Sequence, residues 1–166
     1  MSYQEVSVQT PLGESTEYIM TDDPVLITIL RAGLAMHNGL LRTFDRCDSA
    51  FVSAYREHTS PEEFNIHVEY LAAPNLDQRV WVISDPMLAS GSSMVNVYKA
   101  LLKFGKPKKV YLVVSIATPQ AIELVQKELP EDTEIWTAAI DDELTAESYI
   151  VPGLGDAGDL AYGIKV

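Results

Sequence analysis

Val80–Met94, which reads VWVISDPMLASGSSM, is the stretch from which the fold can be worked out. Its apolar beginning predicts a buried strand over Val80–Ser84, and the acid Asp85 follows where that strand ends. A loop of small and hydroxyl residues comes next, and a helical pattern then runs from Met94 to Phe104. This order predicts a strand, a turn and a helix, with the turn at the carboxyl end of the strand.

The composition of this turn is typical of a phosphate-binding loop. Free backbone N–H groups, serine hydroxyls and the positive end of the helix dipole would meet at one point, which favours an anion. Asp85 repels a phosphate, but it can accept hydrogen bonds from sugar hydroxyls or help hold a hydrated cation. A phosphate beside a polyol suggests a sugar phosphate. The alternative is a plain turn whose serines only cap the helix, since the loop is neither a Walker loop nor a dinucleotide fingerprint.

Buried strands alternate with helices over residues 25–140, which predicts an α/β fold built on a doubly wound parallel sheet. Further strands are expected at Val25–Leu30, Ser49–Tyr55, Phe64–Leu71, Val110–Ile116 and Glu134–Ile140. Further helices are expected at Leu34–Phe44 and from Thr118 to about Leu129. The second and third of those strands flank a polar loop, so we expect an antiparallel excursion that acts as a flap.

Several polar residues stand at the carboxyl ends of the expected strands. Ligands of doubly wound sheets bind beyond these ends, where neighbouring loops part. Arg31, Arg56, Asp85 and the loop 88–93 all occupy such positions. We therefore predict that they converge on one site for an anionic ligand.

The two ends of the chain differ from this pattern. Residues 1–23 are polar and turn-rich, and they predict two short edge strands around a turn at Pro11–Gly13. The tail Tyr149–Gly163 is rich in glycine and proline, so it cannot form a long regular element. Glycines there would let the backbone approach a planar ring that carries amide groups. The alternative is an ordinary tail rich in loops.

Charge and composition exclude several classes of function. The 166 residues suit a single domain, expected over residues 1–166, and the net charge of −12 opposes nucleic acid and anionic lipid. No apolar run approaches the ~20 residues that a membrane span needs. The single cysteine, Cys47, excludes an internal disulfide and fits a reducing compartment, so a cytoplasmic location is expected.

Three motifs follow one another along the chain: ILRAGL at Ile29–Leu34, SDPMLASGSS at Ser84–Ser93 and YIVPGLGDAGD at Tyr149–Asp159. From about residue 25 onward the chain closely resembles the uracil phosphoribosyltransferase family, which has the type I phosphoribosyltransferase fold. The resemblance implies a doubly wound, mainly parallel sheet with a flap hairpin at about 56–72 and a C-terminal hood at about 141–163. It also implies that uracil and 5-phosphoribosyl 1-diphosphate are converted to UMP and diphosphate.

The same resemblance implies a role for each motif. Arg31, with the turn at Ala32 and Gly33, would contact the diphosphate, and Arg56 would contact it from the flap. Asp85 would hold the ribose hydroxyls, so that catalysis is expected to depend on these two arginines and this acid. The loop that would cradle the donor's 5-phosphate consists of Pro86, Met87, Leu88, Ala89, Ser90, Gly91, Ser92 and Ser93. The hood residues that would bind uracil are Ile150, Gly155, Asp156 and Ala157.

Magnesium is expected to bind through the donor's diphosphate rather than in a cage of side chains. Displacement at the anomeric carbon passes through a state like an oxocarbenium ion, so Mg²⁺ and arginine would stabilise the departing diphosphate. A flap would exclude the water that otherwise hydrolyses the donor. No carboxylate pair or histidine stands out as an obligatory base, so positioning is expected to dominate catalysis.

The chain departs from the family pattern at two places. Ser90 and Ser92 stand where the family usually has threonine and glycine, which predicts an ordinary backbone conformation at Ser92. Family members also carry several tens of residues before the point where this chain starts. A homo-oligomer, most simply a dimer, is expected, while GTP activation stays open. Two other functions also stay open: a non-catalytic regulator that senses a nucleotide, and a transferase for another base.

Overall fold

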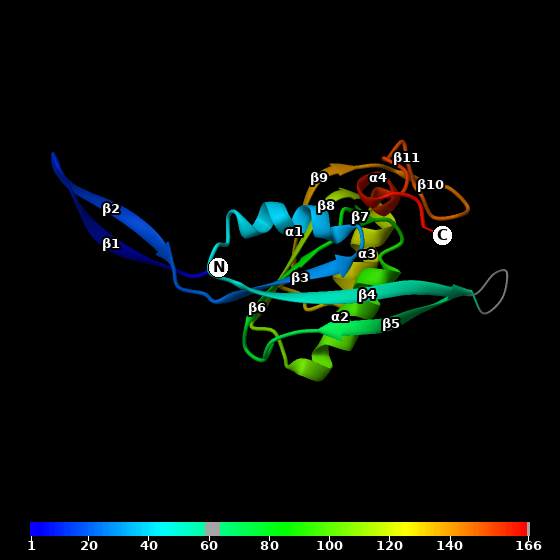
Figure 1. Cartoon of the computed structure of the whole chain (residues 1–166), viewed down its shortest axis with the longest axis horizontal. Helices are drawn as coiled ribbons and strands as arrows, with labels where there is room; N and C mark the ends of the chain where they lie inside the picture. The colour runs from blue at the N-terminus through cyan, green and yellow to red at the C-terminus, as the bar shows by residue number, and fades with distance from the viewer. Residues whose placement is uncertain (59–63, 166) are drawn as a thin grey trace.

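The computed structural model describes residues 1–58 and 64–165, and it describes side chains outside residues 54–69. Its centre is a seven-stranded sheet of order β5-β4-β3-β6-β8-β7, in which β9 also pairs with β8 (Figure 1). Within this sheet the pair β4 and β5 is antiparallel, and the other described pairs are parallel. The strands are β3 (Pro24–Leu30), β4 (Asp48–His58), β5 (Phe64–Ala72), β6 (Val80–Ser84), β7 (Met87–Leu88), β8 (Lys109–Ala117) and β9 (Glu134–Ile140).

Three helices connect the parallel strands and cover the sheet from both sides. They are α1 (Gly33–Leu41), α2 (Ser92–Leu101) and α3 (Pro119–Glu128). Figure 1 shows α1 and α2 on opposite faces of the sheet. The larger core lies under α2 and α3, and the smaller one lies under α1. The α/β fold with a doubly wound, mainly parallel sheet is therefore confirmed.

The central strands β3 and β6 supply side chains to both cores because successive residues of a strand point to opposite faces. Ile27 and Ile83 pack in the core under α2 and α3, whereas Leu26 and Val82 pack in the core under α1. Trp81 is fully buried, and its indole N–H donates to the carbonyl of Leu76 at 2.9 Å. These contacts explain why both strands are continuous apolar runs.

The predicted helix starts and stops agree with the structure within a few residues. Thr118 caps α3, since its hydroxyl accepts a hydrogen bond from the backbone N–H of Ala121 at 3.1 Å. After α2 the chain makes a 3-10 turn over Leu102–Phe104, and the turn ends at Gly105. Ser92 is the first residue of α2, as an ordinary backbone conformation at this position predicts.

The predicted strands near the N-terminus form, but not as short edge strands. They are β1 (Tyr3–Thr10) and β2 (Gly13–Met20), which pair only with each other among the described strands. Their register runs from Tyr3 opposite Met20 to Thr10 opposite Gly13, so all eight positions are paired. The hairpin projects from the body of the molecule (Figure 1), where no described strand of the central sheet offers it an edge.

The prediction that Glu134–Ile140 is a core strand is wrong in one respect. The strand forms as β9, but Trp136 is 62% exposed and Ile140 is 53% exposed. β9 lies at an edge of the sheet, and only its inner side chains, such as Ile135, pack against the core. On the other face α1 packs mainly against β3 and β6, so it leaves Trp136 uncovered.

The antiparallel hairpin of β4 and β5 is present, but its tip, residues 59–63, and the side chain of Arg56 lie outside what the structure describes. None of the described helices is long and apolar enough to span a membrane.

Gly105 offers a test of the fold because it combines a strained backbone with a close approach. Its φ is +137°, and a Cβ there would lie 2.4 Å from both Cα and N of Asp77. We expect Gly105→Ala to lower the free energy of unfolding by more than about 2 kcal/mol, measured by urea denaturation. The matched control is Gly39→Ala in α1, where a Cβ meets nothing within 4 Å. That variant should raise the free energy of unfolding by about 0.5–1 kcal/mol. Equal effects of the two changes would contradict the close approach of Gly105 to Asp77.

Candidate active site

A crevice of about 450 Å³ opens where the chain reverses its direction across the sheet. From β3 the chain passes through α1 to β4 on one side, whereas β6 leads through α2 to β8 on the other side. The loops after β3 and β6 therefore part, which is where ligands bind in open sheets of this type. Three segments line the crevice: the loop after β3, the loop after β6 and the C-terminal region.

The structure brings most of the predicted site residues into this one crevice. Those that line it are Arg31, Ala32, Asp85, Met87, Leu88, Ala89, Ser90, Gly91, Ser93, Gly155, Asp156 and Ala157. Arg56 cannot be assessed, because its side chain lies outside the described part of the chain. Segments that are more than 120 residues apart in sequence therefore meet at one rim of the sheet.

Four predicted residues do not line the crevice, each for a physical reason. Gly33 is buried beneath it, where an added Cβ would lie 2.8 Å from the carbonyl oxygen of Ser84. The carbonyl of Pro86 faces β8 and accepts hydrogen bonds from two of its N–H groups at 3.0 Å. Ser92 belongs to the first turn of α2, and the side chain of Ile150 is only 2% exposed.

Asp85 lies directly after β6, at the floor of the crevice. Its backbone N–H donates to the carbonyl of Val113 at 3.2 Å, which fixes the strand end against β8. Its carboxylate accepts one described hydrogen bond, from the N–H of Met87 at 3.2 Å. Burial raises the pKa of Asp85 to about 7, and the Met87 hydrogen bond lowers it only in part. This carboxylate has few partners of its own, so a ligand with hydroxyl groups can supply them.

The loop after β7 presents open hydrogen-bond donors. Gly91 precedes α2 with a φ of +79°, and no side chain caps the helix. Within the described residues, the hydroxyls of Ser90, Ser92 and Ser93 take part in no hydrogen bond. The plain-cap alternative therefore fails, because these serines do not satisfy the N–H groups at the start of α2. Thr118 holds the loop in place, since its hydroxyl donates to the carbonyl of Ala89 at 2.7 Å.

Arg31 lies between the start of α1 and the C-terminal region. A cis peptide bond joins it to Leu30, and α1 begins after it without a side-chain cap or an acid in its first turn. One guanidinium nitrogen lies 2.7 Å from the carboxylate of Asp159, and the other lies 3.3 Å from the carbonyl of Gly163. The Arg31 Nε–H is buried and bonds to none of the described residues. An anion in the crevice could accept this donor.

The C-terminal region closes over the crevice as short elements joined by turns, as its glycine content predicts. They are β10 (Glu143–Leu144), β11 (Ile150–Val151) and α4 (Ala157–Tyr162). Asp156 caps α4 by accepting the N–H of Asp159 at 2.9 Å. α4 lies next to the loop after β3, since a Cβ on Gly158 would make ordinary van der Waals contact with that of Ala32 at 3.8 Å.

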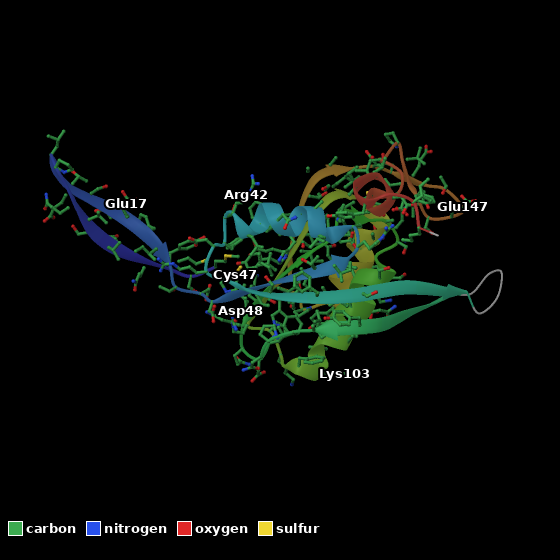
Figure 2. The ribbon with its side chains drawn as sticks, in the orientation of Figure 1. Glu17, Arg42, Cys47, Asp48, Lys103 and Glu147 are labelled. Atoms are coloured by element: carbon green, nitrogen blue, oxygen red, sulfur yellow. The ribbon has the colours of Figure 1, made fainter. Side chains whose placement is uncertain are left out.

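Sequence reasoning missed several residues that line the crevice. Glu147, Ser148 and Tyr149 reach it from the loop between β10 and β11, and Figure 2 shows Glu147 on that loop. Lys165 adds a cation from the end of the chain. Tyr149 stands inside a motif that was recognised, but no pattern singles out the other three. They come from irregular segments, whose path is set by tertiary contacts.

The described part of the chain offers no dedicated metal cage. It contains no group of three or more His, Cys, Asp or Glu side chains arranged to hold a metal ion. What the crevice does combine is two uncapped helix N-termini, the Arg31 guanidinium and the Asp85 carboxylate. Such a combination can bind a molecule that carries anionic groups at its ends and hydroxyls between them.

Comparison with known proteins connects this geometry to a family. The family model described as uracil phosphoribosyltransferase matches residues 1–164. A uracil phosphoribosyltransferase of Porphyromonas gingivalis is 52% identical over the whole of this chain, which covers 77% of that protein. One from Methanococcus vannielii is 40% identical over 98% of this chain and 70% of its own length.

Solved structures agree on the fold. The AQ2163 protein of Aquifex aeolicus is 31% identical and matches all of this chain and 78% of its own, with a TM-score of 0.85. A hypoxanthine phosphoribosyltransferase of Staphylococcus aureus is only 13% identical, covers 86% of this chain and 79% of its own, and has a TM-score of 0.58. Such a distant likeness carries the fold alone, which is that of the type I phosphoribosyltransferases. With a family model that spans nearly the whole chain and relatives at 40–52% identity, this protein belongs to the uracil phosphoribosyltransferase family.

Proposed function

We propose that the crevice is the active site in which uracil and 5-phosphoribosyl 1-diphosphate are converted to UMP and diphosphate. The observation that carries this proposal is the convergence of three chemically different segments on one cavity of about 450 Å³. One segment suits a phosphate, one suits a diphosphate and one suits a flat base. Family membership supports the choice of uracil and of this donor.

In this proposal the 5-phosphate binds at the start of α2. The uncapped N–H groups, the glycine at position 91 and the unpaired hydroxyls of Ser90 and Ser93 supply the donors. Asp85 holds the ribose hydroxyls, which would satisfy the acceptor capacity that its half-buried carboxylate retains. A donor bound in this way places its anomeric carbon between the loop after β6 and the C-terminal region.

The diphosphate then binds at the start of α1. Arg31 offers a buried Nε–H without a described partner, and the first turn of α1 carries no acid that would repel an anion. The Ala32 side of the same turn lines the crevice, while Gly33 supports the turn from below. Arg56 remains our proposed second contact, from the hairpin of β4 and β5.

Uracil binds against the C-terminal region, which we call the hood. The backbone of Gly155, Asp156 and Ala157 lines the crevice there and can hydrogen bond to the edge of the ring. Ile150 is buried under the hood and anchors it through packing, and its backbone remains a proposed contact. Because backbone groups read the ring edge, the site would tell uracil from other bases by the order of donors and acceptors.

Magnesium fits this site as an ion that binds through the diphosphate of the donor. Mg²⁺ usually retains several waters and binds through one or two carboxylates plus substrate phosphates, so the absence of a described cage does not oppose it. Asp156 faces the crevice and is the residue that we propose contacts the ion's water shell. When bound, the ion would neutralise negative charge on the leaving diphosphate.

The chain's own residues contribute mainly by position and charge. As the bond from the anomeric carbon to the diphosphate oxygen breaks, Arg31 and the α1 N-terminus stabilise the charge on the leaving group. Asp85 keeps the ribose oriented while the anomeric carbon bonds to the uracil nitrogen, whose proton passes to the departing diphosphate. Closure of the hood and the hairpin would keep water from the anomeric carbon.

A spectrophotometric assay of UMP formation tests the proposal. We expect turnover with uracil, the ribosyl donor and Mg²⁺, and at least about a hundredfold lower kcat/KM with orotate, hypoxanthine or adenine. Faster turnover of another base would identify a different transferase. Saturable binding of UMP or of the donor without any turnover would favour the nucleotide-sensing regulator instead.

Asp85→Asn probes the proposed ribose contact. We expect kcat/KM for the donor to fall about 10- to 100-fold, because hydrogen bonds to a charged acceptor are lost. Steady-state kinetics measure this loss, and a circular dichroism spectrum like that of the wild type shows that the fold persists. Activity equal to that of the wild type would contradict the role of Asp85.

The same variant should also change how stability depends on pH. The unfolded protein ionises Asp85 near its ordinary pKa of 3.8, whereas the folded protein does so at about 7. The folded state therefore loses stability as the pH rises from about 4 to about 7, by up to ~1.4 kcal/mol per pH unit. Asparagine cannot ionise, so its gain over wild type in urea denaturation should be roughly 2–3 kcal/mol larger at pH 8 than at pH 5. A gain independent of pH would contradict the raised pKa.

We also propose that the enzyme is a homodimer joined through its projecting hairpin. The hairpin of β1 and β2 carries large apolar side chains that are at least 43% exposed, namely Tyr3, Val8, Leu12, Tyr18 and Ile19. By the strand register, Tyr3 and Tyr18 point to one face of the hairpin and Val8 and Ile19 to the other, so a second copy packed along the arm would meet apolar groups on either face. Burial against a second copy would remove them from water.

Light scattering tests the dimer. We expect a mass of twice the 18.3 kDa chain at micromolar concentration, and a monomer when Val8 and Tyr18 are both replaced by serine. Glu17→Gln is the matched control, since Glu17 lies on the same hairpin and is polar and exposed (Figure 2). A monomeric wild type, or equal effects of both changes, would refute the hairpin as the interface.

A single free thiol supports a reducing environment for this enzyme. Cys47 is half-buried, donates to the carbonyl of Phe44 at 2.8 Å, and has its pKa raised by burial. It is therefore a poorly reactive thiol rather than a nucleophile. We propose a cytoplasmic location, where such a cysteine stays reduced.

A further inference from the structure

A chain of polar side chains runs beneath the floor of the crevice, in an otherwise apolar interior. His37 is 2% exposed, and its two ring nitrogens lie 2.7 Å from the hydroxyl of Thr28 and 3.2 Å from that of Ser49. The Thr28 hydroxyl lies 3.5 Å from that of Ser84, which in turn donates to the carbonyl of Ile27 at 3.4 Å. Both Thr28 and Ser84 are fully buried.

The hydrogen bonds of this polar chain can all form at once if their donors point in one direction along it. If Ser84 donates to Ile27, its oxygen can accept from Thr28, and Thr28 can then accept from the Nδ1–H of His37. Ser49 donates to the remaining nitrogen, so every hydroxyl has a partner. Burial lowers the pKa of His37, in agreement with a neutral ring that donates from one nitrogen and accepts at the other.

The polar chain links four elements, α1, β3, β4 and β6, and two of the loops that line the crevice follow β3 and β6. His37 lies on α1, one turn after the loop that carries Arg31, and its partners lie on β3 and β4. Ser84 is the last residue of β6, directly before Asp85. Gly33 shows how closely these parts fit, because its Cβ would meet the Ser84 carbonyl at 2.8 Å and Thr28 at 3.2 Å.

Neither Arg31 nor Asp85 is part of this polar chain, but both lie close to it in sequence. Arg31 follows shortly after Thr28, and Asp85 directly follows Ser84. The start of α1 cannot shift along the sheet without stretching the bond between His37 and Thr28. The end of β6 cannot shift without disturbing the contact between Thr28 and Ser84. Buried hydrogen bonds of this kind are costly to break without a replacement.

We propose that His37 is a positioning residue for the transfer reaction, acting through Thr28 to keep Arg31 and Asp85 at a fixed separation. The inference rests on the proposed function, in which the donor spans these two residues with its diphosphate and its ribose. That separation matters most while the bond between the two parts of the donor is breaking. Loosening it therefore lowers kcat more than it weakens binding of uracil.

Two substitutions remove the link in different ways. His37→Phe keeps a ring against Phe51, whose centroid lies 5.1 Å away, but removes both nitrogens. Thr28→Val keeps the shape of the threonine and removes its hydroxyl. Each variant should lower kcat about 10- to 100-fold and change the KM for uracil less than about threefold. Because both cut the same link, the double variant should be no slower than the slower single variant.

A conservative variant and a packing variant separate positioning from stability. His37→Asn places an amide near the position of Nδ1, so it should recover most of the lost kcat while staying as unstable as His37→Phe. Leu41→Ala, also on α1, removes packing in the core under that helix and leaves the polar chain intact. It should lower the midpoint of urea unfolding with less than about a twofold change in kcat.

Amide hydrogen exchange of the ligand-free protein gives a readout that does not depend on activity. Thr28→Val should speed exchange in the segments 31–33 and 85–91, and Leu41→Ala should not. Unchanged exchange in Thr28→Val, or wild-type kcat in folded Thr28→Val and His37→Phe, would overturn the inference. So would additive losses in the double variant. A wild-type protein that makes no UMP would instead refute the proposed function, and the exchange result would still decide the role of the chain.

Discussion

The parallel pairing of β3 with β6 is the constraint on which the rest of the structure depends. Both strands are buried on both faces, and they pair from Pro24 opposite Val80 to Thr28 opposite Ser84. A shift of one residue would turn every apolar side chain of one strand to the wrong face, so burial fixes the register. The register in turn decides where each strand ends. Arg31 and Asp85 therefore reach the same rim as a consequence of how the core packs, before any ligand is present.

The burial of these strands also leaves polar groups at their ends poorly solvated, and such groups favour binding of a ligand. A carboxylate at the end of a buried strand is poorly solvated, and its pKa rises to about 7. Natural proteins accept such local instability at functional sites because the group is then ready for a ligand that supplies the missing partners. The loop after β7 also leaves groups ready for a ligand, since the first N–H groups of α2 have no side-chain cap. Among the described residues, two buried side-chain polar atoms have no partner, and one of them, Arg31 Nε, belongs to a residue that lines the crevice. The neighbouring polar chain through His37, by contrast, is paired at both ring nitrogens.

Local sequence patterns predict the parts of this fold in which one face or both faces of an element are buried. The strands β3, β6 and β8 and the capped start of α3 at Thr118 are of this kind. Sequence patterns fail to predict the burial of a side chain where that burial depends on which other element packs beside it. Trp136 belongs to an apolar strand, but α1 does not extend over it, and sequence alone does not reveal how far a helix reaches. For the site, the residues at the strand ends and the glycine-rich C-terminal segment can be predicted from the sequence. The approach of Glu147 and Lys165 to the crevice cannot, because it depends on the path of irregular segments.

The pairing of Arg31 with Asp159 shows why the two halves of the site are not independent. Both side chains are partly exposed, so the ion pair by itself contributes roughly 1 kcal/mol or less. A diphosphate carries more charge than one carboxylate and competes for the same guanidinium. In the proposed binding mode, a diphosphate at the start of α1 would therefore weaken one of the contacts that hold α4, while α4 would still lie next to Ala32 at Gly158. The guanidinium that we assign to the diphosphate also contacts Asp159 and Gly163 of the hood that we assign to uracil. Under these assignments, occupancy of one half of the crevice would alter the shape of the other.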